Sequence, residues 1–184
     1  VLHVATFKSN ELDSVIDAIN ATGYGLTFGL QTRIDDRVQH VSDRIHAGNI
    51  YVNRNQIGAI VGSQPFGGEG LSGTGPKAGG PHYLTRFLKV EAKQVQDVWA
   101  AEMSVQKVQS AIIDAPAGAP EMTSSLPGPT GESNRLSTMS RPPVLCLGPG
   151  AEAAKQQADI MIALGGRAAV ADGSVSAEAL STLA

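Results

Sequence analysis

The sequence predicts an α/β fold. Short apolar runs typical of strands alternate with stretches in which apolar residues recur at the three- and four-residue spacing of a helix. Glycines separate these stretches, and the alternation begins again after residue 143. Because strand–helix–strand order is typical of crossover connections, we expect a sheet with helices packed on it.

Three strands are predicted in the first part of the chain. The first follows from alternation of larger apolar residues with small or polar ones, and the other two follow from short apolar runs next to glycine or polar residues. We expect these strands at 2–7, 26–31 and 50–52.

Two helices are predicted between these strands. The first has Ser9 or Asn10 as its N-cap, and its apolar stripe recurs at helical spacing from Leu12. The second begins at Asp35 and Asp36, whose carboxylates suit the positive end of a helix dipole, and it ends at a glycine. Each helix therefore has one apolar face to pack against the sheet.

The segment after the third strand is unusually rich in glycine. From residue 54 to residue 80, nine of 27 residues are glycine, too many for the interior of a helix or strand. Glycine allows bare backbone to approach a ligand, and successive peptide N–H groups can form a nest that holds an anion. We therefore predict a binding loop for a small anionic ligand, with Phe66 as an apolar wall. The alternative is a flexible surface connection.

Several motifs around this loop resemble those of the aldehyde dehydrogenases, which carry G-x-x-x-V-N on a strand, then P-F-G-G and S-G-x-G. The matching segments are 48–53, 65–68 and 72–75. A narrower resemblance is to the L-glutamate γ-semialdehyde dehydrogenase (1-pyrroline-5-carboxylate dehydrogenase) module of bifunctional proline utilization A (PutA) proteins. It rests on segments 51–55, 64–75 and 76–81, and on Leu-Pro-Gly-Pro-Thr-Gly-Glu-Ser-Asn at 126–134.

The resemblance implies an enzyme that oxidises L-glutamate γ-semialdehyde to L-glutamate with NAD+ in proline catabolism. In that family the nucleophilic cysteine and the glutamate that contacts the cofactor ribose lie upstream of the residue matching Val1. We therefore expect a C-terminal fragment that is inactive alone, without catalytic or cofactor-binding residues of its own. The parent is expected to be a cytoplasmic homo-oligomer that carries FAD in a separate proline dehydrogenase domain.

Substrate binding is the function that the resemblance assigns to this chain. By position, the backbone N–H groups of Gly58 and Ala59 match those that bind the substrate carboxylate, and Phe66 matches the aromatic that lines the aldehyde pocket. The structural alternatives are that Gly58 only serves a turn and Phe66 only fills the core. Two other functions stay open: part of an aldehyde dehydrogenase with a different acidic substrate, and a non-catalytic structural or oligomerisation segment.

Three regions are predicted along the chain. Residues 1–90 are expected to be the C-terminal part of an aldehyde dehydrogenase catalytic domain, and within it 82–90 an extended segment. Residues 91–143 are expected to be a linker or wrapping segment: 95–114 has the spacing of an amphipathic helix, and Pro, Gly, Ser and Thr dominate 115–143. Residues 144–184 are expected to be an incomplete, truncated Rossmann-like domain.

The last region has strand and helix patterns that suggest a Rossmann-like element, expected at 144–147, 151–164, 167–170 and 176–183. Gly148 and Gly150 form only part of a phosphate-binding fingerprint, since no third glycine follows at the required spacing. Asp172, after the second of these strands, is where a ribose could bind. The resemblance implies that this region keeps a dinucleotide fold without binding the cofactor.

Composition excludes several other functions. The net charge is −3 and the basic residues are scattered, so we expect no nucleic-acid contact, and no apolar run is long enough for a transmembrane segment. The four histidines lack the spacing of metal ligands, and no serine has the setting of a hydrolase nucleophile. Cys146, the only cysteine, fits a reducing compartment and is expected to be a buried, unreactive core residue.

Overall fold

The structure, a computed structural model, describes residues 2–89 and 98–183. The chain divides into two compact units. The first consists of Val1–Lys89 together with Ser125–Arg135, and the second consists of Val90–Ser124 together with Leu136–Ala184.

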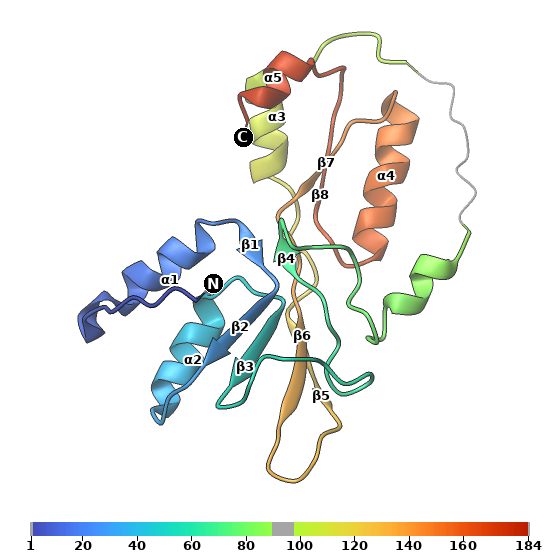
Figure 1. Ribbon diagram of the computed structural model, residues 1–184. Helices are drawn as coiled ribbons and strands as arrows, with labels where there is room; N and C mark the ends of the chain where they lie inside the picture. Colours follow the sequence, from blue (N-terminus) through green and yellow to red (C-terminus); the bar gives the residue numbers. More distant parts are fainter. Residues whose placement is uncertain (1, 90–97, 184) are drawn as a thin grey trace. The chain divides into compact units, whose positions relative to one another are not determined.

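In the first unit, the described residues up to Lys89 form two α-helices, two short 3-10 helices and four short strands (Figure 1). The helical segments are η1 (Ser9–Glu11), α1 (Leu12–Asn20), α2 (Asp35–Arg44) and η2 (Tyr83–Phe87). The strands are β1 (Tyr24–Gly25), β2 (Thr27–Leu30), β3 (Asn49–Val52) and β4 (Glu69–Gly70).

A β–α–β crossover forms the centre of this unit, as predicted. β2 and β3 are parallel, with Phe28 opposite Ile50, and α2 connects them. Ile16 of α1 and Val41 of α2 are fully buried in one cluster. Leu30 and other apolar residues of the two strands pack against the same cluster, so both helices cover this pair of strands.

The pair β1 and β4 joins the segment after α1 to the end of the glycine-rich loop. These two strands are antiparallel, with Tyr24 opposite Gly70. Gly25 is required here because a Cβ at that position would lie 2.0 Å from the carbonyl oxygen of His46. The glycine therefore allows the backbone after α2 to pass close to β1.

Two predictions for the first unit are wrong. Residues 2–8 form no strand, and Leu2 and Val4 are 87% and 82% exposed. Alternation alone does not make a strand, because a strand also needs a hydrogen-bonded neighbour, and no described residue pairs with this segment. The segment 83–87 is a 3-10 helix instead of an extended chain.

The predicted N-cap of the first helix is also wrong. A 3-10 turn precedes α1, and Glu11 closes this turn by accepting a hydrogen bond from the Lys8 amide at 2.8 Å. A carboxylate three residues after the start of a helical segment competes with Ser9 and Asn10 as a partner for the free amides.

In the second unit, the described residues form three helices and a parallel pair of strands, together with parts of the β5–β6 pair given below. The helices are α3 (Val105–Ile113), α4 (Ala151–Ala163) and α5 (Ala177–Ser181), and the strands are β7 (Val144–Cys146) and β8 (Ala168–Val170). Alternate residues of β7 face opposite sides. Cys146 packs with Ala158 of α4, while Leu145 packs against the cluster that contains Val108 of α3. The two strands are thus covered on both faces.

The prediction for 91–143 is only partly correct. The helix is α3, which is shorter than the expected 95–114; residues 95–97 lie outside the described residues, and Trp99 and Met103 precede the helix. Residues 115–143 contain two paired strands that the composition did not predict, β5 (Met122–Leu126) and β6 (Asn134–Thr138). Their serines and threonines pair across the strands, as between Thr123 and Ser137 at 2.6 Å.

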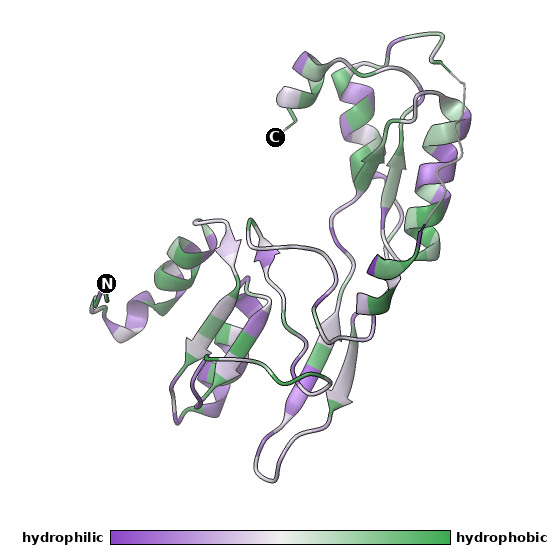
Figure 2. Cartoon of the chain, turned by 45° about the vertical axis from the view of Figure 1, so that its right-hand side comes forward, coloured by the Kyte–Doolittle hydropathy of each residue, from purple (hydrophilic) through white to green (hydrophobic). Residues whose placement is uncertain are grey.

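Figure 2 shows that the helices carry both hydrophobic and hydrophilic residues, as expected for helices with one face on a sheet. Within the described ranges, no helix is long and apolar enough to span a bilayer.

Candidate functional site

The glycine-rich loop leaves the sheet at Asn53, immediately after β3. Asn53 has a positive φ of 55°, which asparagine tolerates better than most residues. Its amide donates to Leu30 at 2.8 Å, and its side-chain oxygen accepts a hydrogen bond from the Thr32 amide at 2.9 Å. These bonds to the end of β2 fix the direction in which the loop departs.

Gly58 and Ala59 lie on an exposed part of this loop. Gly58 has φ +79°, and a Cβ added there would meet nothing within 4 Å. Neither amide N–H has a hydrogen-bond partner among the residues that the structure describes. Two neighbouring peptide donors are therefore free to bind an external acceptor.

Tyr51 controls the orientation of the peptide between these two residues. Its hydroxyl donates to the carbonyl oxygen of Gly58 at 3.3 Å, and its side chain belongs to β3 and is only 5% exposed. In a trans peptide the N–H points opposite to the C=O, so the Ala59 N–H points away from Tyr51. Sequence reasoning missed this residue, although a tyrosine on the strand before a glycine-rich loop is a signal for such a contact.

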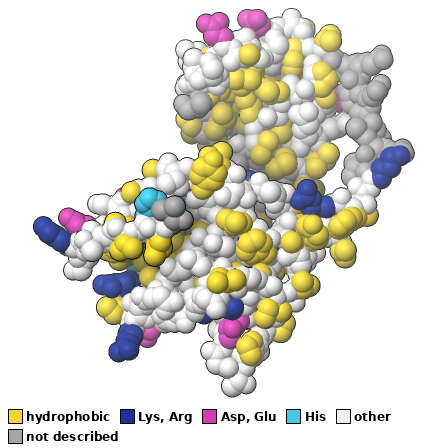
Figure 3. All heavy atoms as spheres, in the orientation of Figure 1, with side chains coloured by type: hydrophobic (Ala, Val, Ile, Leu, Met, Phe, Trp, Pro, Cys, Tyr) yellow, Lys and Arg dark blue, Asp and Glu magenta, His cyan; other side chains and the backbone are white. Residues whose placement is uncertain are grey.

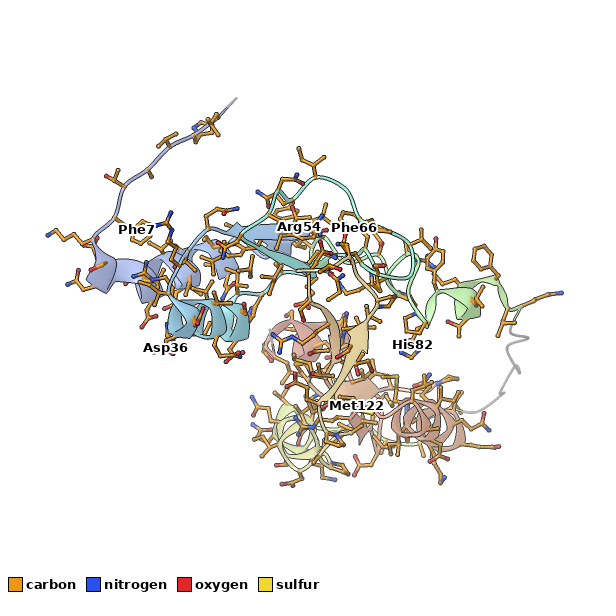
Figure 4. All side chains as sticks on the ribbon, turned by 90° about the horizontal axis from the view of Figure 1, so that it is seen from below. Phe7, Asp36, Arg54, Phe66, His82 and Met122 are labelled. Carbon is orange, nitrogen blue, oxygen red and sulfur yellow. The ribbon has the colours of Figure 1, made fainter. Side chains whose placement is uncertain are left out.

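Phe66 follows the exposed part of the loop and is half-buried. Its backbone pairs with Ala78: the Phe66 amide donates at 3.0 Å, and its carbonyl accepts at 2.8 Å. The pairing fixes the backbone from which the ring projects. Figure 4 shows the side chains of Arg54, before the exposed part of the loop, and Phe66, after it.

Lys77 holds the Pro-Phe-Gly-Gly segment against the start of β3. Its ammonium donates to the carbonyl oxygens of Gly48 and, at 2.7 Å, Gly67. The two glycine backbones pass so close that a Cβ on Gly48 would lie 1.8 Å from the Gly67 oxygen. Burial lowers the pKa of Lys77, although the charge of Glu69 acts in the opposite direction. Lys77 thus has a structural function, because its ammonium joins these two backbone segments.

Glu132 binds residues on either side of the exposed part of the loop, Arg54 before it and Gln64 after it. Its Oε1 accepts from Gln64 Nε2 at 2.8 Å and from Asn134 Nδ2 at 2.9 Å, and it lies 3.1 Å from the Arg54 guanidinium. The Asn134 hydrogen bond, followed by Gln64 and the Arg54 charge, keeps the pKa of Glu132 below its ordinary value against partial desolvation.

Two hollows in the described surface lie away from these residues. One, of about 490 Å³, lies along α1 beside Phe7 and Ile19, and the other, of about 360 Å³, lies between α3 and the end of β8 beside Met103 and Val170. Neither includes Gly58, Ala59 or Phe66. Because Gly58 and Ala59 are exposed, the candidate site is an open loop surface.

The remaining candidate groups are occupied or buried. Cys146 is 2% exposed, as predicted, and burial raises the pKa of its thiol, the opposite of what a nucleophile needs. Asp172 pairs with Lys107 at 3.5 Å. In the described part of the chain, no group of three metal-binding side chains comes together.

The sequence profile of the aldehyde dehydrogenase family matches residues 1–93. The bifunctional protein PutA of Klebsiella aerogenes is 42% identical over 192 residues, which cover 90% of this chain and 15% of the relative. A protein of Halalkalibacterium halodurans named 1-pyrroline-5-carboxylate dehydrogenase 1 is 45% identical over 96 residues, or 52% of this chain and 18% of the relative.

Among solved structures, a mutant of Bradyrhizobium japonicum proline utilization A is 64% identical with a TM-score of 0.43, over 44% of this chain and 8% of that chain. The chain thus spans less than a fifth of the length of these relatives.

Proposed function

This chain belongs to the aldehyde dehydrogenase family, and on that basis we propose that it supplies the carboxylate-binding loop of an NAD-dependent L-glutamate γ-semialdehyde dehydrogenase. The parent would be a PutA-type protein that oxidises the aldehyde to L-glutamate in proline catabolism. The names of the matching relatives, PutA and 1-pyrroline-5-carboxylate dehydrogenase, support this activity.

The observation that carries the proposal is the pair of free amides at Gly58 and Ala59. L-Glutamate γ-semialdehyde has a carboxylate at the end remote from its aldehyde, and peptide N–H groups bind a carboxylate through charge-assisted hydrogen bonds. Tyr51 fixes the intervening peptide, so at least one donor is oriented before the substrate arrives. Such preorganisation reduces the entropy lost on binding.

Phe66 would act at the aldehyde end. Its backbone is held by Ala78, and an apolar ring beside the reacting carbonyl would exclude water from it. Chemistry at that carbonyl needs a thiolate, for which the buried Cys146 is unsuited, so the nucleophile would come from another part of the parent protein.

The same proposal covers the cofactors and the assembly. NAD+ would accept the hydride and would be held mainly by residues outside this chain, while FAD would belong to the proline dehydrogenase domain of the parent. The β7–α4–β8 unit would be a truncated Rossmann-like element that binds no cofactor, because the fingerprint lacks its third glycine. The parent would be a cytoplasmic homo-oligomer.

A second candidate is a structural or oligomerisation segment without a part in substrate binding. The burial of Cys146, the only thiol, favours it, since this chain then has no nucleophile of its own. An enzyme for another acidic aldehyde remains the alternative within the family. Both differ from the main proposal in what a change at Gly58 should do.

The test is to compare Gly58→Ala with Gly62→Ala in the intact parent protein. Both glycines have φ near +80° and open space for a Cβ, so the backbone strain of the two variants is matched. Gly58→Ala should raise KM for L-glutamate γ-semialdehyde about tenfold, or by ~1.4 kcal/mol, and leave pentanal, which has no carboxylate, unchanged. Gly62→Ala should have little effect on either aldehyde.

Equal changes with both aldehydes would contradict carboxylate binding at Gly58 and favour a structural segment. A selective effect with an acidic aldehyde of another length, and not with glutamate semialdehyde, would favour the other enzyme.

A further inference from the structure

We propose that Glu132 is a positioning residue for substrate binding, which clamps both ends of the loop that presents Gly58 and Ala59. This loop, residues 55–63, is called the anchor loop below, and Arg54, Gln64 and Glu132 are called the clamp. The inference rests on the function proposed above. It gives a specific role to the motif at 126–134, which lies beyond the residues that match the family profile.

The geometry of the clamp carries the inference. Arg54 immediately precedes the anchor loop, and Gln64 immediately follows it. Both side chains converge on Oε1 of Glu132, at 3.1 Å from the guanidinium and 2.8 Å from the amide nitrogen. One carboxylate oxygen therefore joins two residues ten positions apart, and the distance between the ends of the loop depends on it.

Each partner of Glu132 is held in place by a second contact or by burial. Gln64 is only 7% exposed, so its amide cannot easily replace the carboxylate with water. The Arg54 guanidinium stacks over the Tyr51 ring, 5.3 Å from its centroid. Tyr51 is also the residue whose hydroxyl orients the Gly58 peptide, so the clamp and the free amides share one support.

The segment that carries Glu132 is itself ordered by local contacts. Asn134 donates to the same Oε1 at 2.9 Å and to the carbonyl oxygen of Pro127 at 3.2 Å. A Cβ on Gly128 would lie 2.6 Å from the Asn134 side-chain nitrogen, so the glycine leaves room for this donor. The carboxylate is thus offered from a preorganised turn.

The anchor loop has little other support among the described residues. Ile57 and Val61 are 84% and 83% exposed. Apart from the Tyr51 contact, two backbone hydrogen bonds join the loop to described residues outside it: the Gly62 amide donates to Gly79 at 3.4 Å, and the Ile60 carbonyl accepts from the Gln64 amide at 2.8 Å. With so few internal contacts, the position of its free amides depends on how its ends are held.

The experiment compares Glu132→Ala with Glu121→Ala in the intact parent protein. Glu121 immediately precedes β5, is exposed, and makes no hydrogen bond or ion pair with any described residue, so it controls for loss of a surface glutamate. Two quantities are measured: hydrogen exchange of peptides covering 55–63, and KM and kcat for L-glutamate γ-semialdehyde and for pentanal.

Glu132→Ala should speed exchange in the anchor loop at least about fivefold. It should also raise KM for the acidic aldehyde about tenfold, because a displaced donor pair binds the carboxylate poorly. The value of kcat for this aldehyde, and both KM and kcat for pentanal, should stay within about twofold of wild type. Glu132→Gln, which keeps an acceptor oxygen, should recover part of the KM effect. Glu121→Ala should match wild type in both measurements.

An unchanged rate of hydrogen exchange in 55–63 would overturn the clamp. Equal changes in KM and kcat for both aldehydes would also overturn it, because that is the result expected of a residue that only stabilises the fold. The exchange measurement does not depend on the identity of the substrate. If the wild-type protein does not prefer the acidic aldehyde, the proposed function fails, and faster exchange in Glu132→Ala still supports the clamp on the loop.

Discussion

At the residue scale, the groups proposed to bind the substrate carboxylate are backbone amides, and Tyr51, from the preceding strand, orients the peptide between them. Tyr51 orients the Gly58 peptide, and Lys77 fixes the Pro-Phe-Gly-Gly turn by donating to two carbonyl oxygens. A glycine-rich loop without its own side-chain contacts would sample many conformations. These two residues explain how a sequence so rich in glycine can present a defined donor pair.

Lys77 gives a prediction at this scale. Lys77→Met keeps the apolar stem but leaves the carbonyl oxygens of Gly48 and Gly67 without their donor, so it should lower the free energy of unfolding by about 1–3 kcal/mol. Lys155→Met is the control: among the described residues Lys155 pairs with Asp159 at the exposed surface, so the substitution should cost less than about 1 kcal/mol. Urea unfolding of the 184-residue chain measures both. Equal effects would mean that the carbonyl contacts contribute no more than a surface pair.

Glycine density predicted a binding loop with Phe66 as an apolar wall, and the family resemblance then assigned Gly58 and Ala59 by position. The function of all three residues remains a prediction. Tyr51 and Glu132 were missed as partners of that loop. Their contacts join residues seven and 68 positions apart, as for Tyr51 with Gly58 and Gln64 with Glu132, and periodicity carries no information about such pairs.

At the element scale, the helices and parallel strands of both units follow from periodicity, because the spacing of apolar residues specifies which face is buried. This logic confirmed α1, α2 and the pair β2–β3. Periodicity failed where an element depends on its neighbours. Residues 2–7 have the alternation of a strand but pair with no described residue. The paired strands β5 and β6 were missed because they are rich in Ser and Thr instead of apolar residues. Pairing in an exposed sheet needs cross-strand contacts more than a buried face.

The packing of α1 on α2 gives a prediction about pH. Asp13 of α1 contacts His40 and Arg44 of α2, and Arg44 also binds Asp17 at 2.8 Å. The hydrogen bond with His40, followed by the charges of Arg44 and His40, lowers the pKa of Asp13 and outweighs partial desolvation. Because the folded pKa lies below the ordinary value of 3.8, the stabilisation is present above pH 3.8 and is lost as the pH falls through the folded pKa.

Asp13→Asn should therefore lower the melting temperature of the 184-residue chain at neutral pH, and this difference should shrink as the pH falls below 3.8. Asp43→Asn is the control, since the Asp43 carboxylate bonds only to Gln39 of the same helix among the described residues. A difference between Asp13→Asn and wild type that stays constant down to acid pH would show that the carboxylate pair does not couple the helices.

At the scale of the whole molecule, much apolar surface is exposed. Figure 3 shows hydrophobic side chains over the face that it draws, and the exposed large residues of the described ranges include Leu84, Phe87 and Leu164. The two units also have separate cores: the first around Ile16 and Val41, the second around Val108 and Cys146. Separate small cores of this kind bury a modest share of each unit's surface, so both would gain stability from further protein contacts.

The buried thiol in the second of these cores gives the last prediction. Cys146 is 2% exposed and packs with Ala158 and Ala168, so it should react with a thiol reagent only when its unit opens. In the native 184-residue chain, the thiol should be labelled much more slowly than in the chain unfolded by urea. The labelling rate should rise with the fraction of unfolded chain as urea is added. In the intact parent, Cys146→Ala should leave kcat for aldehyde oxidation within about twofold of wild type, because the reaction would use another thiolate. The opposite outcome is rapid labelling of the native chain together with loss of aldehyde oxidation in Cys146→Ala. It would identify Cys146 as the nucleophile and contradict the assignment of the chemistry to other residues of the parent.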